Sequence, residues 1–188
     1  MKDEIGAKGK NDYERLSDRE LIQMFLDGDI MAFNEFYRRY YGALFKFIIS
    51  YCGDTHIAED TLQEVFLKLL GFKVRLGLIK NIKKYLYSIA VNRCRDMVSA
   101  RKREMVFNGS EREMGMTYNT SDVNVDIQIM NQFVDKLPQT QREVLLLRTK
   151  SDLQFSEIGE ILGISENSAK VNYFYAVTSL KKMMGGEY

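Results

Sequence analysis

The apolar residues of this sequence recur at helical spacing over long stretches, and the chain contains one proline to interrupt them. Over residues 30–52, apolar and aromatic side chains fall three or four positions apart, which predicts a helix that buries one face. The members of this stripe are Phe33, Phe36, Tyr37, Tyr40, Leu44, Phe47, Ile48 and Tyr51. The sequence lacks the evenly spaced alternating runs that are typical of strands in a sandwich or barrel. The fold class is therefore expected to be all-α.

Four such helices are expected within residues 17–104, and we predict that they pack as one bundle. Ser17 and Glu20 have the spacing of a capping box at the start of the first helix. Gly28 is expected to end that helix, and Asp29 can cap the second. The third and fourth helices are expected to begin near residue 54 and at residue 82. Residues 1–16 are polar and are expected to form a flexible leader.

The helical periodicity stops over residues 105–124, a polar stretch that contains two glycines. We interpret this stretch as a flexible linker. A second helical group follows over residues 125–188, in which Pro138 is expected at the first position of a helix. The chain is therefore predicted to form two small helical domains joined by a tether.

Composition disfavours several classes of protein. Lysine plus arginine number 27 and aspartate plus glutamate 26, so the net charge indicates nothing about partners. No apolar run reaches the roughly 20 residues of a membrane span, and the N-terminus lacks the apolar core of a signal peptide. We therefore expect no membrane insertion and a cytoplasmic location. Cys52 and Cys94 lack CxxC spacing, and we interpret them as packed, reduced thiols rather than as ligands or a disulfide.

An enzyme acting on nucleic acid is the least favoured class. The chain has one histidine, His56, and no cluster of metal-binding residues in its sequence. It also lacks a glycine-rich loop of the kind that binds phosphate. We therefore predict no catalytic residue, no metal and no cofactor.

Residues 157–182 are predicted to form two short helices on either side of Gly163. Gly159 supplies a small residue where the two helices touch, and Ser165 can cap the second helix. The buried stripe of that helix is expected to contain Ala169, Tyr173, Ala176, Val177, Leu180 and Met184. A helix-turn-helix presents the exposed N-terminal residues of its second helix to the DNA major groove. An ordinary helical hairpin in a small bundle is the alternative.

Positive charge is concentrated in residues 71–104. Ten lysine and arginine residues there are opposed by Asp96 and Glu104, which gives a local charge of +8. Phe72, Tyr85 and Tyr87 are interleaved with these cations. Cations bind phosphates and aromatic rings can hold unstacked bases, so the segment is expected to bind single-stranded or opening DNA. The alternative is a solvated helix face that binds nothing.

The preceding helix has the opposite character. Asp60, Gln63 and Glu64 span slightly more than one turn and are expected to share one exposed side. Two carboxylates and an amide could hold a metal, but no further ligands accompany them in the sequence. A surface that binds a protein partner is the favoured interpretation, with a plain solvated helix as the alternative.

The three features, in this order, resemble a bacterial RNA polymerase sigma factor of the extracytoplasmic-function group in the sigma-70 family. The resemblance covers residues 18–184. AEDTLQEVFLKLL (58–70) is similar to the segment that binds the polymerase clamp, and YLYSIAVNRCRDMVSARKRE (85–104) resembles the helix for the minus-ten promoter element. LPQTQREVLLLR (137–148) and the helix-turn-helix residues resemble the domain that reads the minus-thirty-five element. The resemblance implies a region 2-like four-helix bundle followed by a region 4-like helix-turn-helix domain.

The resemblance also implies roles for particular residues. The expected polymerase contacts are Asp60, Gln63, Glu64 and Phe66. The expected minus-ten DNA contacts combine the cations of the basic segment with matched helix positions: Lys73, Arg75, Lys80, Lys83, Lys84, Asn92, Arg93, Arg95, Asp96 and Arg101. The expected minus-thirty-five contacts are Ser165, Glu166, Asn167, Ser168, Lys170, Val171 and Asn172.

One departure from the family concerns the second helix of the helix-turn-helix. Asn172 and Tyr175 stand where the family commonly has basic residues. Each lost phosphate contact lowers the salt-dependent affinity for DNA. Minus-thirty-five readout is therefore expected to be weak or relaxed in sequence, and promoter location is expected to depend partly on another DNA-bound partner.

The expected function is transcription initiation directed to promoters, with no covalent chemistry performed by this chain. The expected partners are core RNA polymerase and promoter DNA, together with an anti-sigma factor or an additional DNA-targeting protein. The alternative is a stand-alone helix-turn-helix regulator, a class that usually dimerises and binds half-sites one helical turn apart.

Overall fold

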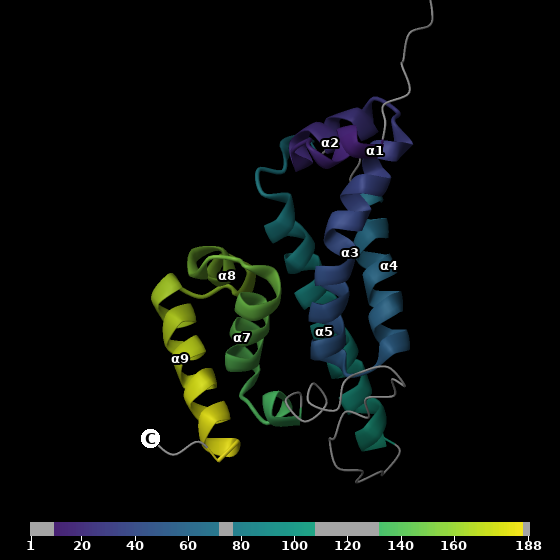
Figure 1. The fold of residues 1–188 in the computed structure, drawn as a ribbon. Coiled ribbons are helices and arrows are strands. Elements are labelled where there is room, and N and C mark those ends of the chain that lie inside the picture. Colours follow the sequence, from purple (N-terminus) through teal and green to yellow (C-terminus); the bar gives the residue numbers. More distant parts are fainter. Residues whose placement is uncertain (1–9, 72–76, 108–131, 186–188) are drawn as a thin grey trace, which may run out of the picture.

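The computed structural model describes residues 10–71, 77–107 and 132–185, and the regular elements in these ranges are helices (Figure 1). The N-terminal domain contains α1 (Lys10–Glu14), α2 (Asp18–Leu26), α3 (Ile30–Cys52), α4 (Thr55–Gly71) and α5 (Ile82–Phe107). The C-terminal domain contains α7 (Gln139–Ser151), α8 (Phe155–Leu162) and α9 (Glu166–Met183). The predicted all-α fold class and the two helical domains are confirmed.

Local sequence signals place the helix ends. The Ser17 hydroxyl accepts from the Glu20 amide at 3.3 Å, and Glu20 Oε2 accepts from the Ser17 amide at 2.7 Å, which is the predicted capping box. Asp29 caps α3 by accepting from the backbone of Met31 and Ala32. Pro138 is the N-cap of α7 rather than its first helical residue, so that prediction was wrong by one position.

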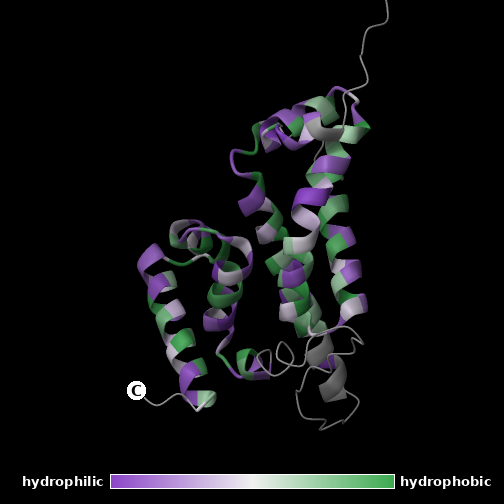
Figure 2. Cartoon of the chain, viewed as in Figure 1, coloured by the Kyte–Doolittle hydropathy of each residue, from purple (hydrophilic) through white to green (hydrophobic). Residues whose placement is uncertain are grey.

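The N-terminal bundle buries the predicted apolar stripe of α3 together with apolar residues of α4 and α5. Figure 2 shows hydrophobic and hydrophilic residues alternating along each helix, as expected when a helix buries one face. Phe36, Leu44, Phe47 and Ile48 of α3 are almost fully buried. Tyr37 was assigned to the same stripe, but it is 37% exposed. It leaves the stripe because it lies on the flank of α3 that faces Phe66 of α4.

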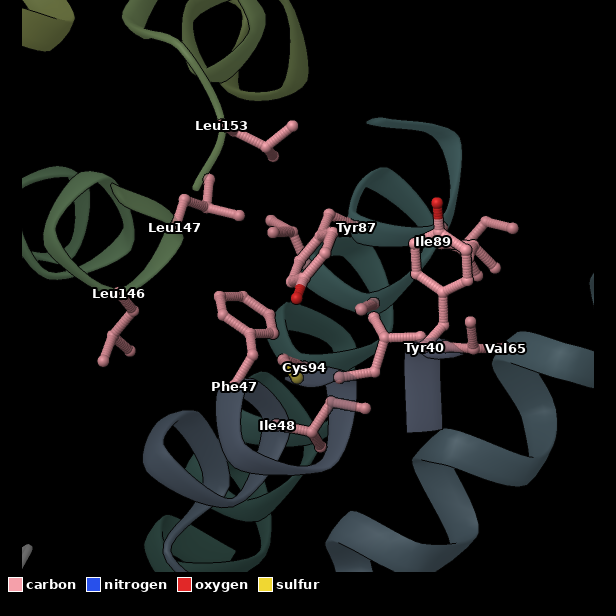
Figure 3. Close-up of a cluster of buried hydrophobic side chains, with 14 of the residues drawn as sticks. Tyr40, Phe47, Ile48, Val65, Tyr87, Ile89, Cys94, Leu146, Leu147 and Leu153 are labelled. Carbon is pink, nitrogen blue, oxygen red and sulfur yellow. The ribbon is translucent and has the colours of Figure 1, made fainter. Parts of the chain in front are cut away.

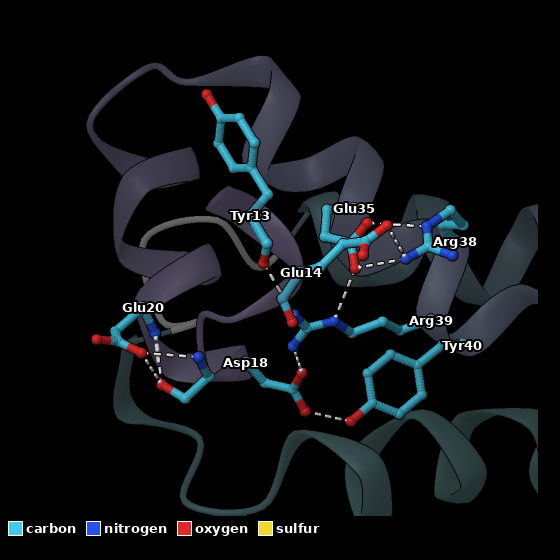
Figure 4. Close-up of polar contacts among 9 residues, drawn as sticks. Tyr13, Glu14, Asp18, Glu20, Glu35, Arg38, Arg39 and Tyr40 are labelled. Atoms are coloured by element: carbon cyan, nitrogen blue, oxygen red, sulfur yellow. Dashed lines mark hydrogen bonds and ion pairs between the residues drawn. The ribbon is translucent and has the colours of Figure 1, made fainter. Parts of the chain in front are cut away.

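The expected flexible leader is wrong for residues 10–16. Within these residues α1 packs on α3, and Tyr13 is buried. Arg39 of α3 donates to the carbonyl oxygens of Tyr13 and Glu14 at 2.9 and 3.0 Å, as Figure 4 shows. The Tyr13 hydroxyl donates to Asp29 at 2.9 Å. Charged and polar partners on α3 therefore hold a segment whose own sequence is polar. Residues 1–9 lie outside the described residues.

The boundary between the bundle and the predicted linker also differs from expectation. Residues 105–107 continue α5 instead of beginning the linker. The remainder of the predicted linker, residues 108–124, lies outside the described residues, as do residues 125–131 of the second predicted helical group.

The two domains pack against each other and share one hydrophobic core, which the sequence did not predict. Helix α7 lies against α3, and α8 lies against α5. Figure 3 shows Leu147 and Leu153 of the C-terminal domain beside Phe47 and Tyr87 of the bundle. All four side chains are at most 1% exposed. The contact is therefore a dry, close-packed surface and not a loose approach of two domains.

Both cysteines lie in this core as free thiols, in agreement with their interpretation as packed residues. Their sulfur atoms are 3.6 Å apart, one on α3 and the other on α5. Burial raises the pKa of the Cys94 thiol, which keeps it in its neutral form.

Candidate polymerase- and DNA-binding surfaces

The predicted polymerase-binding residues lie on α4, and three of the four reach the surface. Asp60 and Gln63 are exposed, and Glu64 is half-buried. Glu64 forms an ion pair with Arg93 of α5. The acidic face of α4 and the basic face of α5 therefore meet along one edge.

Phe66, the fourth predicted polymerase contact, does not reach the surface. It is 4% exposed and its ring packs on Tyr37, with centroids 4.5 Å apart. The residue beside it, Leu67, is 64% exposed and carries the apolar surface of this helix face instead. Because an α-helix has 3.6 residues per turn, adjacent side chains point about 100° apart. One of two neighbouring residues can therefore be buried while the other is exposed.

An aromatic row on α3 extends the α4 surface, and sequence reasoning missed it. Tyr37 and Tyr41 are 37% and 39% exposed, and Tyr41 stacks on Phe45 with ring centroids 6.0 Å apart. These residues are four positions apart, so they form a second stripe beside the buried one. The sequence contains this spacing, but the predicted stripe of residues 33–51 places Tyr37 in the core and does not include Tyr41.

Helix α5 and the residues before it carry the predicted minus-ten contacts. Lys80, Asn92 and Asp96 are exposed, while Lys83, Lys84, Arg93 and Arg95 are half-buried. Lys73 and Arg75 lie outside the described residues, as does the side chain of Arg101. The described residues of this set lie on α5 or directly before it, and several of them are bound by other side chains of this chain.

Arg95 is paired with a carboxylate of the C-terminal domain. Its Nε and Nη2 donate to the two oxygens of Glu143 at 2.8 and 2.6 Å, a bidentate arrangement. Tyr51 and Gln139 donate to Glu143 Oε1 at 2.7 and 3.0 Å. Glu143 is 1% exposed, so a buried carboxylate is held by three side chains, of which Arg95 and Tyr51 come from the other domain.

The ionisation of Glu143 follows from these contacts. Burial favours the neutral acid, but the hydrogen bonds from Arg95, Tyr51 and Gln139 outweigh burial and lower the pKa of Glu143. Burial and the neighbouring Glu143 carboxylate raise the pKa of the Tyr51 hydroxyl. Glu143 is therefore ionised at neutral pH, and Tyr51 keeps its proton and donates it in the hydrogen bond.

The C-terminal domain has the geometry of a helix-turn-helix. Gly163 ends α8 with φ +72°, a left-handed conformation that favours glycine. A Cβ atom on Gly159 would lie 2.7 Å from the Ile164 carbonyl oxygen, so only glycine allows the two helices to approach this closely. Ser165 caps α9 by accepting from the Ser168 amide at 3.1 Å. The predicted roles of these residues are confirmed.

The buried stripe of α9 agrees with prediction except at its end. Ala169 and Ala176 are fully buried, and Tyr173, Val177 and Leu180 pack partly against the core. Met184 is 58% exposed, and Met183 packs in its place. Met184 follows the last helical residue, where the chain has left the helical path.

The predicted minus-thirty-five residues form the outer face at the start of α9. Ser165, Glu166, Asn167, Lys170 and Val171 are exposed, and Ser168 and Asn172 are half-buried. Two polar members are already engaged within the helix. Lys170 pairs with Glu166 at 2.6 Å, and Asn172 donates to the Ser168 carbonyl oxygen at 2.9 Å.

Two aromatic residues continue this face, and the sequence interpretation gave them no DNA-binding role. Phe174 and Tyr175 are 66% and 54% exposed, and Val171, one turn earlier, is 51% exposed. The outer face of α9 is therefore polar at its start and apolar from Val171 onward, and the intrahelical ion pair neutralises the charge of Lys170. In a major groove such side chains can contact thymine methyl groups and sugars.

Two further features bear on the class of protein. Within the described ranges, no group of three or more histidine, cysteine, aspartate or glutamate side chains could hold a metal ion. None of the helices that the structure describes is both long enough and apolar enough to cross a bilayer.

Comparison with known families matches both domains. Residues 36–104 match the family Sigma-70 region 2, and residues 127–180 match the family Sigma-70, region 4. Together the two matches cover about two thirds of the chain.

Similar proteins of known class cover most of the chain. The ECF RNA polymerase sigma factor SigM of Bacillus subtilis is 27% identical over 157 residues, covering 81% of this chain and 95% of that protein. SigW of the same organism, another ECF RNA polymerase sigma factor, is 25% identical over 182 residues, covering 88% and 96%.

Solved structures share the fold. The sigma factor RpoE of Bartonella quintana, crystallised with the anti-sigma factor NepR, superposes with a TM-score of 0.70 at 22% identity, covering 83% of this chain and 98% of that one. CnrH in complex with the cytosolic domain of CnrY gives a TM-score of 0.65 at 19% identity, covering 91% and 99%. The two sigma regions in this order identify the chain as a member of the sigma-70 family, in its extracytoplasmic-function group.

Proposed function

We propose that this protein binds core RNA polymerase, directs it to promoters and holds the separated DNA strands during initiation. One observation carries the proposal above all: the acidic α4, the cationic α5 and a helix-turn-helix occur in one chain, in the order of sigma regions 2 and 4. The protein performs no covalent chemistry in this proposal, is not an enzyme and works in the cytoplasm.

Helix α4 is the proposed polymerase-binding element. Asp60, Gln63 and Glu64 offer charge and hydrogen bonding, and exposed Leu67 and Tyr37 supply apolar surface beside them. Protein interfaces commonly combine an apolar centre with a polar rim. Phe66 supports this surface from beneath by fixing the Tyr37 ring.

Helix α5 and the preceding loop are the proposed minus-ten element. Lys80, Lys83 and Lys84 are placed before or within its first turn, and Asn92, Arg93, Arg95 and Asp96 follow along its length. The cations would bind phosphates of the non-template strand. Holding displaced bases offsets the cost of unstacking them, a few kcal/mol per base.

Helix α9 is the proposed minus-thirty-five element, with weak electrostatic attraction for DNA. Lys170 is paired with Glu166, and the exposed centre of the face consists of Val171, Phe174 and Tyr175. Because phosphate contacts dominate affinity for DNA, this face is expected to depend on an additional DNA-bound partner for promoter location. Footprints of the holoenzyme that show strong, salt-resistant protection at minus thirty-five without any such partner would contradict this part.

An anti-sigma factor is the second proposed protein partner. Two solved proteins with this fold are described in complexes, RpoE with the anti-sigma factor NepR and CnrH with the cytosolic domain of CnrY. A partner of this kind would compete with polymerase for the surfaces on α4 or α5.

The stand-alone regulator that acts as a dimer is not favoured, because a region 2 domain with its polymerase-binding helix has no role in that class. The test is reconstituted transcription from fragmented genomic DNA with purified core polymerase. We expect the chain to be required for initiation at discrete start sites. A stable dimer that binds palindromic DNA and leaves initiation unchanged would favour the regulator instead.

A further inference from the structure

Three exposed side chains form a line along the outer face of α9. Asn167, Val171 and Phe174 follow one another at spacings of four and three residues, so they lie on one face of the helix. Val171 and Phe174 are 51% and 66% exposed, and Asn167 is exposed as well. The opposite face buries Ala169 and Ala176. These three residues, which we call the outer line of α9, therefore point away from the body of the C-terminal domain.

The packing of α8 against α9 fixes the direction of the outer line. Gly159 allows the two helices to approach closely, and Ser165 caps the start of α9. The rings of Phe155 on α8 and Tyr173 on α9 meet edge to face, with centroids 5.5 Å apart. A side chain can recognise a base only if its position is well defined. The start of α9 is held in the manner that base recognition requires.

The cations of α9 are poorly placed for recognising guanine. Arginine or lysine contacts to guanine are the commonest specific contacts in the major groove, but residues 166–183 contain no arginine. Lys170 is the one lysine before residue 181, and it pairs with Glu166 at 2.6 Å. Lys181 and Lys182 lie in the last turn, far from the N-terminal residues that contact base edges. The start of α9 therefore offers guanine one lysine, whose charge is already neutralised.

The outer line instead has the chemistry of contacts to A·T base pairs. Asparagine binds N6 and N7 of adenine, and apolar side chains contact the C5-methyl group of thymine. Asn167 supplies an exposed amide, and Val171 and Phe174 supply the apolar surface. Asn172 is less available than Asn167, because its amide donates to the Ser168 carbonyl oxygen at 2.9 Å.

The length of the outer line matches a short run of base pairs. Seven residues separate Asn167 from Phe174, which corresponds to about 10.5 Å along the helix. Successive base pairs are about 3.4 Å apart, and the major groove is about 12 Å wide. The three side chains therefore have the spacing needed to contact about three neighbouring base pairs in one groove.

We propose that α9 recognises an A·T-rich upstream promoter element, with Asn167 binding adenine and Val171 and Phe174 contacting thymine methyl groups. The inference rests on the proposed function, in which α9 binds the minus-thirty-five element, and it names the bases that the helix prefers. Base edges determine the preference, whereas phosphate contacts determine most of the affinity. A helix with few available cations can therefore bind weakly and still distinguish A·T from G·C pairs.

The test uses holoenzyme reconstituted from the full chain and core polymerase, with a promoter recovered from fragmented genomic DNA. Its upstream segment is randomised, and duplexes that the holoenzyme binds at low salt are selected and sequenced. We expect enrichment of A·T pairs in the upstream segment. Replacing thymine by uracil in a selected duplex then removes the methyl groups and keeps the base pairing. We expect binding to weaken about fourfold for each methyl group contacted, the equivalent of about 0.8 kcal/mol.

Two variants assign these effects to the outer line. In Val171→Ser with Phe174→Ser, uracil is expected to weaken binding less than twofold, because the apolar partners of the methyl groups are absent. The control is Met184→Ser, which removes a 58% exposed apolar side chain beyond the end of α9 and should keep the parent's sensitivity to uracil. For Asn167→Ala, the probe is 7-deazaadenine, which lacks the N7 acceptor. It should weaken the parent about tenfold and this variant less than twofold.

Enrichment of G·C pairs, or equal sensitivity to uracil in the parent and the double serine variant, would overturn the inference. Selection of no upstream sequence would also overturn it and would favour a protein partner for the outer line. Should the double variant fail to fold, the response of the parent to uracil decides alone. A chain that does not bind polymerase contradicts the proposed function and this inference with it. A holoenzyme that initiates at discrete sites without an A·T preference contradicts only the inference.

Discussion

The two helices proposed to bind promoter DNA, α5 and α9, differ in where the ion-pair partners of their cations lie. On α5, Arg93 and Arg95 pair with Glu64 of α4 and Glu143 of α7. On α9, Lys170 pairs with Glu166 one turn earlier in the same helix. The partner of Arg95 depends on how the two domains are arranged, whereas the partner of Lys170 is fixed by its own helix.

This difference indicates where control of DNA binding lies. Separating the domains would free Arg95 and Lys84 on α5, but it would leave the Lys170 pair unchanged. A conformational change can therefore convert α5 from an occupied to an available DNA-binding element. The outer face of α9 already lies at the surface in this arrangement of the domains, so its affinity for DNA is limited by its composition.

The largest expected effect comes from removing the buried partner of α5. Glu143→Ala leaves Arg95 and Tyr51 without their acceptor in a largely buried site, so we expect the free energy of unfolding to fall by about 3 kcal/mol. The matched change on α9, Glu166→Ala, removes an exposed pair and is expected to cost less than about 1 kcal/mol. Urea denaturation measures both. Equal losses of unfolding free energy would mean that the Glu143 contact stabilises the protein no more than the exposed Glu166 pair does.

The next largest loss of stability is expected from a substitution in α8 that displaces α9 and leaves the residues of α5 unchanged. Gly159→Ala would bring a Cβ atom 2.7 Å from the Ile164 carbonyl oxygen and force α8 and α9 apart. We expect a loss of about 2 kcal/mol from this overpacking. Gly42→Ala on α3, where nothing lies within 4 Å, is the control and should stabilise the protein by about 1 kcal/mol. Thermal unfolding that ranks the two variants in the opposite order would rule out the close helix contact.

The proposed DNA role of α5 is tested by Arg95→Ala in the holoenzyme. We expect polymerase binding to be retained and open-complex formation to fall about tenfold, or about 1.4 kcal/mol. Permanganate reactivity of unpaired thymines measures the open complex. Arg95 is a cleaner choice than Arg93, because Arg93 also pairs with Glu64 on the polymerase-binding helix. A parallel loss of polymerase binding would show that α4 and α5 do not have separate roles.

Acid is expected to weaken the contact of α5 before it affects α9. The pKa of Glu143 in the folded protein is below its ordinary value of about 4.3. Its stabilising contribution is therefore fully present above that value and is lost as the pH falls through the lowered pKa. The distance between spin labels at Arg19→Cys and Lys181→Cys should lengthen over this range. The same titration on Glu143→Gln should lack the transition, and its persistence there would assign the acid effect to another group.

The smallest expected effect is on α9 itself. Lys170→Ala removes a cation that Glu166 already neutralises, so we expect holoenzyme binding at minus thirty-five to weaken less than threefold. Phe174→Ser, which removes exposed apolar surface, should weaken it more. Quantitative footprinting at several salt concentrations compares the two. A larger effect for Lys170→Ala than for Phe174→Ser would show that α9 binds DNA mainly through phosphate contacts.

Local sequence signals predicted the helices, the capping residues and the helix-turn-helix, because each depends on neighbours within a few positions. Ser17 with Glu20, and Gly159 with Gly163, are of this kind. The exposure of Leu67 was not predicted, although its neighbour Phe66 has the spacing of an inward-facing residue and is buried. Both are apolar, and their order of burial depends on the position of Tyr37 in another helix.

The contact between the domains could not be predicted from the sequence at all. Glu143 stands between Arg142 and the apolar run of residues 144–147, and a lone glutamate there gives no indication of a distant partner. Its partners Arg95 and Tyr51 are 48 and 92 positions away. The packing of α1 was missed for a similar reason, because Arg39 holds its backbone from 25 or 26 positions away. Such contacts depend on tertiary geometry and leave no local periodicity.

The binding of purified core polymerase to this chain and to its Asp60→Lys variant tests the account most directly. We expect the parent chain and an Asp27→Lys control to form a stable complex on gel filtration, and Asp60→Lys to bind at least about tenfold more weakly, or about 1.4 kcal/mol. Far-ultraviolet circular dichroism should show the same helical content in all three. If the parent chain does not associate with polymerase, or if Asp60→Lys binds as tightly as the control, the proposed role of α4 is wrong.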